Sequence, residues 1–130
     1  MGVRHFLTLK DLSPSELRGV AERARELKRH RAEGQRPSLV NNRILAMIFD
    51  KSSTRTRVSF EAAMIESGGG AIFLSPRDTQ LGRGEPIPDT ARVISRMCDA
   101  IVVRTSSHDT VETLARYSQV PVVNGLTDSF

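Results

Sequence analysis

The sequence of 130 residues has no tryptophan, one tyrosine, one cysteine and no long apolar run. Without a long apolar run we expect no membrane span and no membrane partner. With so few aromatics there is little to stack on nucleic-acid bases, so we expect no nucleic-acid partner. A single cysteine excludes an internal disulfide and favours a reducing compartment.

The remaining candidate ligands and nucleophiles are scattered. His5, His30 and His108 lack the spacing of metal ligands, so we expect neither a metal nor a cofactor. Cys98 follows an apolar helix face, which indicates packing rather than nucleophilic chemistry. A helix signal begins at Ser13, which leaves no room for a targeting peptide before it, and we therefore expect a cytoplasmic protein.

Apolar runs and helical patterns alternate along the chain. Predicted strands cover residues 44–49, 71–74, 100–103 and 121–124, and predicted helices cover 14–31, 56–67, 89–97 and 109–117. This alternation is typical of βαβ units with right-handed crossovers. It predicts an α/β fold with three layers, in which helices cover both faces of a four-stranded parallel sheet in a Rossmann-like arrangement.

Apolar residues at helical spacing predict the side that each helix buries. In the first helix they are Leu17, Val20, Ala21, Ala24 and Leu27, and in the second Val58, Ala62, Ala63 and Ile65. In the third helix they are Ala91, Ile94 and Met97, and in the fourth Val111, Leu114 and Ala115.

The run Ser-Ser-Thr-Arg-Thr-Arg at 52–57 is the main candidate site. It follows the apolar strand 44–49 and opens a helix, so backbone N–H groups, hydroxyls and two guanidiniums gather at one sheet edge. These are the groups that hold a phosphate-like dianion, and the net charge of +4 also favours an anionic small molecule. The alternative is a capped surface helix with solvated arginines, but two arginines directly after a buried strand favour an anion site.

Three segments resemble the transcarbamylase family. Residues 49–61 are similar to its carbamoyl-phosphate motif, and 80–86 with 89–92 resemble the mobile loop of the ornithine branch and the helix after it. Residues 124–128 resemble the segment that leads into the donor site. The resemblance covers essentially the whole chain and matches the amino-terminal, carbamoyl-phosphate-binding half of the family, most closely the ornithine branch.

Particular positions separate the branches of that family. Lys51 and Ser52 stand where the aspartate branch usually has proline before the Ser-Thr-Arg run. Gln80 and Arg83 stand where that branch typically uses serine and lysine. Asp50 replaces the glutamate common in the ornithine branch, a mild departure that keeps the acid.

The resemblance also implies roles for single residues. Those that would bind the phosphate of the donor are Ser53, Thr54, Arg55 and Thr56, with Arg57 supporting them. Arg104 matches the arginine that binds the carbamoyl end, and its alternative is a sheet-edge arginine paired with a helix acid. Gln80 matches a residue that reaches into a neighbouring subunit's site, which implies a homotrimer with shared sites, and its alternative is an ordinary polar loop residue.

The implied activity is carbamoyl transfer from carbamoyl phosphate to the δ-amine of ornithine, an amino-acid acceptor, giving citrulline and phosphate in arginine biosynthesis. Arg55 and Arg104 would be the catalytic residues. Residues 1–130 would form the carbamoyl-phosphate-binding domain, with the acceptor-binding second domain absent, so we expect the chain alone to be inactive.

Other functions remain open on the sequence. Another transcarbamylase could use aspartate, putrescine or an acylated ornithine as acceptor. The isolated chain could instead be a non-catalytic phosphate-binding or trimerisation module. A nucleotide-binding P-loop is a weaker alternative, because the Gly-x-x-x-x-Gly-Lys pattern is absent from the sequence.

Overall fold

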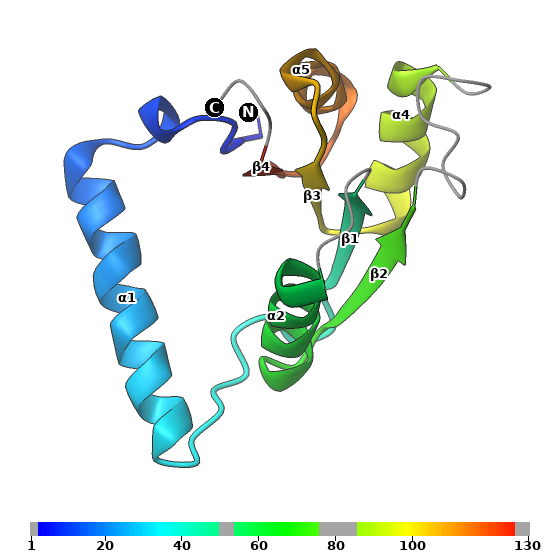
Figure 1. Ribbon diagram of the computed structural model, residues 1–130. Coiled ribbons are helices and arrows are strands. Elements are labelled where there is room, and N and C mark those ends of the chain that lie inside the picture. The colour runs from blue at the N-terminus through cyan, green and yellow to red at the C-terminus, as the bar shows by residue number, and fades with distance from the viewer. Residues whose placement is uncertain (1–2, 50–53, 76–85, 127–130) are drawn as a thin grey trace.

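The computed structural model describes residues 3–49, 54–75 and 86–126, which form a parallel four-stranded sheet with helices on both faces (Figure 1). The strands are β1 (Ile44–Phe49), β2 (Gly70–Leu74), β3 (Ala100–Arg104) and β4 (Val122–Leu126), in the order β2-β1-β3-β4. The helices are the 3₁₀ helix η1 (Leu9–Asp11), α1 (Pro14–Ala32), α2 (Thr54–Glu66), α4 (Ile87–Met97) and α5 (His108–Tyr117). The predicted α/β fold with a parallel sheet is confirmed.

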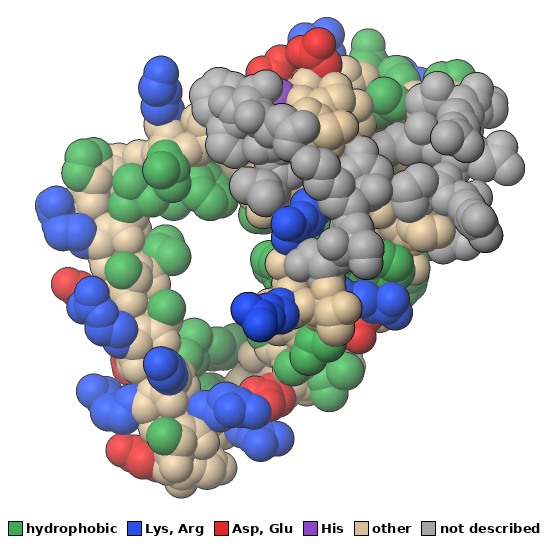
Figure 2. Space-filling view, in the orientation of Figure 1, with side chains coloured by type: hydrophobic (Ala, Val, Ile, Leu, Met, Phe, Trp, Pro, Cys, Tyr) green, Lys and Arg blue, Asp and Glu red, His purple; other side chains and the backbone are tan. Residues whose placement is uncertain are grey.

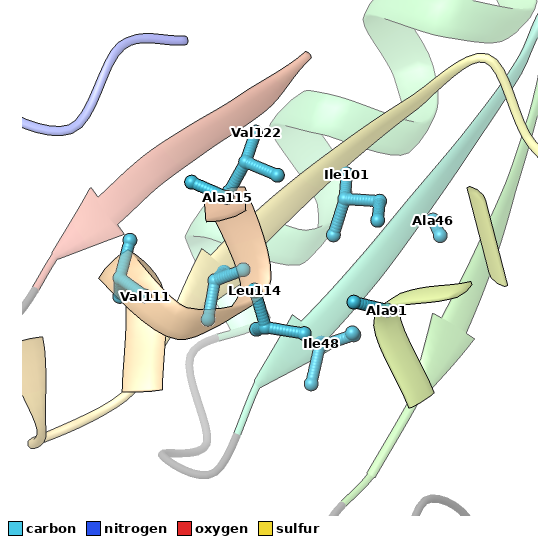
Figure 3. Packing of buried hydrophobic residues seen from close by; sticks show 9 residues of the cluster. Ala46, Ile48, Ala91, Ile101, Val111, Leu114, Ala115 and Val122 are labelled. Atoms are coloured by element: carbon cyan, nitrogen blue, oxygen red, sulfur yellow. The ribbon is translucent and has the colours of Figure 1, made fainter. Parts of the chain in front are cut away.

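Helices α4 and α5 cover one face of the sheet. Figure 3 shows Ala91 of α4 and Leu114 of α5 packed toward the strand side chains beneath them. The buried cluster on this face consists of Ala46, Ile48, Ala91, Ile101, Val103, Val111, Leu114, Ala115 and Val122. Since side chains alternate along a strand, the even-numbered residues of β1 and the odd-numbered residues of β3 lie on this side.

The opposite face is covered by α2 over β1 and β2. Its buried cluster holds Leu45, Met47, Phe49 and Val102, and Phe60 and Met64 of α2 pack against it. The expected inward side of α2 is therefore wrong, because Val58 and Ile65 are exposed. Phe60 and Met64 are one helical turn apart and bury more apolar area than the valine and alanines of the expected stripe.

Helix α1 begins as predicted but packs differently. Ser13 accepts a hydrogen bond from Glu16 N at 3.1 Å, and the Glu16 carboxylate accepts one from Ser13 N at 2.9 Å, which forms the capping box at its start. The apolar stripe expected to be inward is not buried, and Val20 is 59% exposed. Figure 2 shows an open hollow between this helix and the rest of the molecule, with hydrophobic side chains along it.

The two ends of α1 connect to the domain at different places. Before the helix, Phe6 forms a parallel bridge with Val123 of β4, and Phe6 N donates to Val122 O at 2.9 Å. At the other end, the Arg31 guanidinium lies 2.9 Å from the Glu66 carboxylate at the end of α2. The helix therefore spans from the β4 edge to α2 (Figure 1).

Met97 is a further correction to the predicted stripes. In α4, Ala91 is buried and Ile94 packs against the first cluster, but Met97 is 66% exposed. A repeat of three residues drifts around a helix by about 60° per step, so the third member leaves the buried face. Cys98, four residues after Ile94, packs there instead. The inward residues predicted for α5 are confirmed, since Val111, Leu114 and Ala115 are all buried.

Candidate functional site

The first turn of α2 lies directly beyond the carboxyl end of β1, where ligands bind in open parallel sheets. Thr54 and Arg55 are exposed in this turn and Thr56 is half-buried. The N-terminus of a helix presents backbone N–H groups and partial positive charge, which suit an anion. Ser53 and Gln80 lie outside the described residues.

Arg104 joins this turn from β3. Strand alternation places Arg104 on the α2 side, and the register sets it beside Phe49, the last residue of β1. Its Nη1 donates to Thr56 Oγ1 at 2.8 Å, which brings together two predicted site residues 48 positions apart. The side-chain partner that the structure gives Arg104 among the described residues is this hydroxyl on α2, whereas the alternative interpretation called for a helix acid.

The rest of the Arg104 guanidinium supplies a further donor. Its Nε is buried and has no hydrogen-bond partner among the residues that the structure describes. A buried donor without an acceptor costs about 1–3 kcal/mol, so an oxygen atom placed there would be stabilised. The site can thus donate hydrogen bonds from a guanidinium, hydroxyls and backbone amides to one oxygen-rich ligand.

Arg57 makes contacts that the sequence did not reveal. Its Nε donates to the Glu61 carboxylate at 3.0 Å, and its guanidinium carbon lies 4.0 Å from the centre of the Phe73 ring on β2. The spacing of four residues between Arg57 and Glu61 was the available signal for the ion pair. The stacking on Phe73 depends on the packing of α2 against β2, which no local pattern indicates.

The described residues contain no group of three or more His, Cys, Asp or Glu side chains that could hold a metal ion. Burial raises the pKa of the Cys98 thiol, with the nearby Asp99 carboxylate adding to the effect, and the side chain packs against the first buried cluster. In the part of the chain that the structure describes, no helix is long and apolar enough to cross a bilayer.

These features define an α/β domain with an arginine- and hydroxyl-rich site at the carboxyl end of its parallel strands. Residues 4–130 match the family described as aspartate/ornithine carbamoyltransferase, carbamoyl-P binding domain. The chain therefore belongs to the aspartate/ornithine carbamoyltransferase family and corresponds to its carbamoyl-phosphate-binding domain, as the sequence resemblance predicted.

Individual relatives agree with this assignment. The chain is 61% identical over 130 residues to the ornithine carbamoyltransferase of Methylococcus capsulatus. This alignment covers all of this chain and 43% of that protein. Among solved structures it is similar to ornithine carbamoyltransferase from Pyrococcus furiosus, with a TM-score of 0.92, 48% identity, and coverage of 97% of this chain and 40% of that one.

The enzyme from Burkholderia thailandensis gives a TM-score of 0.91 and 52% identity, and it covers 96% of this chain and 43% of the other. The chain thus spans less than half the length of these relatives. Similarity to them shows the fold and the family of this domain.

Proposed function

We propose that this chain binds carbamoyl phosphate as the donor-binding part of an ornithine carbamoyltransferase. The observation that supports it most is the 2.8 Å hydrogen bond from Arg104 to Thr56, which joins the proposed carbamoyl-binding arginine to the proposed phosphate-binding turn. Ser53, Thr54, Arg55 and Thr56 would hold the phosphate, with Arg57 supporting them.

In the proposed reaction the neutral δ-amine of ornithine attacks the carbonyl carbon of carbamoyl phosphate. The tetrahedral intermediate collapses as the bond from its carbon to the phosphate oxygen breaks, the attacking nitrogen gives up one proton to the departing phosphate, and citrulline forms, a step of arginine biosynthesis. Arg104 would stabilise the charge that develops on the carbonyl oxygen, and Arg55 with the α2 N-terminus would stabilise the departing phosphate. The attacking amine needs the acceptor domain, so we propose that this chain binds the donor but does not turn over alone.

The choice of acceptor rests on the relatives. The matched family includes both aspartate and ornithine enzymes, whereas the relatives at about 60% identity are named ornithine carbamoyltransferases. This favours ornithine over aspartate, putrescine or acylated ornithine. A homotrimer in which Gln80 reaches a neighbouring site, and a cytoplasmic location, remain proposals.

The direct test measures the binding of inorganic phosphate to the 130-residue chain by calorimetry or by NMR titration. We expect weak binding that Arg55→Ala reduces by about tenfold to a hundredfold, because a hydrogen bond to a charged group contributes about 1.5–3 kcal/mol. Arg96→Ala, which removes an exposed arginine from the last turn of α4, is the matched control and should leave the affinity unchanged.

Two results would contradict the proposal. Equal phosphate affinity in the Arg55→Ala and Arg96→Ala variants would show that charge alone, rather than this turn, attracts the anion. Robust citrulline formation by the 130-residue chain would show that no acceptor domain is required.

A further inference from the structure

Two arginines in the first turn of α2 differ in what surrounds them. Arg55 is exposed at the proposed donor site. Arg57, two residues later, has its guanidinium face over the Phe73 ring and its Nε bonded to Glu61. A guanidinium stacked on one face and bonded along one edge has little freedom to follow a ligand. The two arginines therefore suit different tasks.

We infer that Arg57 is a positioning residue, which acts through Phe73 and Glu61 to fix the first turn of α2 and does not itself bind the donor. This inference rests on the proposed function. It assigns to Arg57, Glu61 and Phe73 a role in anion affinity, although the last two are a carboxylate and a hydrocarbon ring that cannot attract phosphate.

The contacts of Arg57 continue through Phe73 to Phe49, at the carboxyl end of β1. Phe73 packs edge-on against Phe49, with ring centres 5.5 Å apart and planes at 90°. Phe49 is 2% exposed, ends β1, and lies in register beside Arg104. The aromatic pair thus connects Arg57 on the helix to β1, the strand that pairs with the strand of Arg104.

The position of Thr56 explains why this connection matters. Thr56 directly precedes Arg57 in the chain, and its hydroxyl accepts the hydrogen bond from Arg104. Fixing the Arg57 side chain therefore fixes the backbone that aims the Thr56 hydroxyl and the neighbouring amides. Because orientation of this kind changes affinity steeply with small displacements, loss of the Arg57 contacts should weaken binding.

Two substitutions of the acidic residue, Glu61→Ala and Glu61→Gln, provide the sharpest test. Removing a carboxylate near an anion site strengthens anion binding on charge grounds alone. We expect Glu61→Ala to weaken inorganic phosphate binding about tenfold despite that charge change, because Arg57 loses its partner. Glu61→Gln keeps an acceptor oxygen for Arg57 Nε and should restore at least the original affinity.

Phe73→Leu is the second arm, since it keeps apolar bulk and removes the ring face. We expect it also to weaken phosphate binding about tenfold, and to add nothing further when combined with Glu61→Ala, because both act through Arg57. Urea unfolding of each variant establishes that the folded state is populated before the titration is made.

A second arginine offers a matched control elsewhere in the molecule. Arg92 on α4 lies over the Tyr117 ring at 4.8 Å and has its Nη1 3.2 Å from the Asp89 carboxylate. Asp89→Ala and Tyr117→Leu remove the same two kinds of contact without touching α2. Both should leave phosphate affinity unchanged.

The outcomes separate this inference from the function on which it rests. If the wild-type chain binds phosphate and Arg55→Ala weakens binding, but Glu61→Ala and Phe73→Leu bind as tightly as wild type, the positioning role is refuted and the donor site stands. If Glu61→Ala binds phosphate more tightly, the charge of Glu61 rather than its contact with Arg57 governs the affinity, and the positioning role is refuted. A wild-type chain that binds no phosphate contradicts both proposals.

Discussion

The two faces of the sheet are built from the same strands but are covered to different extents. On one face, α4 and α5 each have three buried residues. On the other, neither α2 nor α1 has a buried residue, although both carry apolar side chains. The central strand β1 is buried on both sides, since Met47 and Ile48 are both within 2% of full burial.

This difference indicates a division of tasks. Burial of apolar area is the main source of stability, so the face under α4 and α5 contributes most of it. The face under α2 supplies the proposed site, where Arg55 and Thr54 must remain accessible to a ligand. Stability and the proposed function thus draw on opposite sides of one sheet.

Truncation of one side chain from each face measures this division. Leu114→Ala, at a fully buried position of α5, should lower the free energy of unfolding by about 2–5 kcal/mol. Met64→Ala, at a half-buried position of α2, should cost about 1 kcal/mol because less of its side chain leaves water on folding. Urea unfolding of both variants checks the comparison, and equal losses would show that the two faces are equally important.

The sequence predicted the well-packed face better than the open one. Continuous apolar runs located all four strands, and the spacing of Val111, Leu114 and Ala115 identified the buried side of α5. These patterns succeed because each residue meets a continuous layer of neighbours. On α2 the pattern failed at Val58 and Ile65, which are exposed. This helix contacts the sheet through few residues, and its large side chains Phe60 and Met64 fill that contact.

The site was predictable in its parts but not in its connections. The Ser-Thr-Arg run indicated an anion site from residue chemistry alone, whereas the role of Arg104 came from family resemblance. The contact between Arg57 and Phe73 was missed because it depends on how α2 lies against β2. The pairing of Phe6 with β4 joins residues 117 positions apart, and local sequence carries no signal for it.

That N-terminal pairing predicts a dependence of stability on pH. His5 Nδ1 accepts a hydrogen bond from Val122 N at 2.9 Å, which requires the neutral ring. Burial lowers the pKa of His5, and the nearby Asp11 carboxylate opposes this effect. In the unfolded chain His5 has its ordinary pKa of 6.5, so below that pH the unfolded chain binds more protons than the folded one. The contribution of His5 to the free energy of unfolding is therefore fully present above that pH and falls as the pH drops.

We expect the loss to be about 1 kcal/mol, the usual net value of one hydrogen bond. It should be seen as a drop in the urea midpoint between about pH 7 and 5. His5→Asn should remove the drop within this window. The lowered pKa values of Asp11 and Glu16, the latter to about 2, give a separate loss in more acidic solution. A drop that persists unchanged in His5→Asn would mean that another group is responsible.

The smallest expected effect is on α1. Val20 is 59% exposed on the apolar side of this helix, so Val20→Lys should change the free energy of unfolding by less than about 0.5 kcal/mol. Lysine is also a better helix former than valine, which works against any loss. The same substitution at Val111, which is fully buried on α5, should prevent folding and provides the matched contrast. A loss of about 2 kcal/mol or more for Val20→Lys would mean that the hollow beside α1 is closed in solution, and the difference between the two faces would disappear.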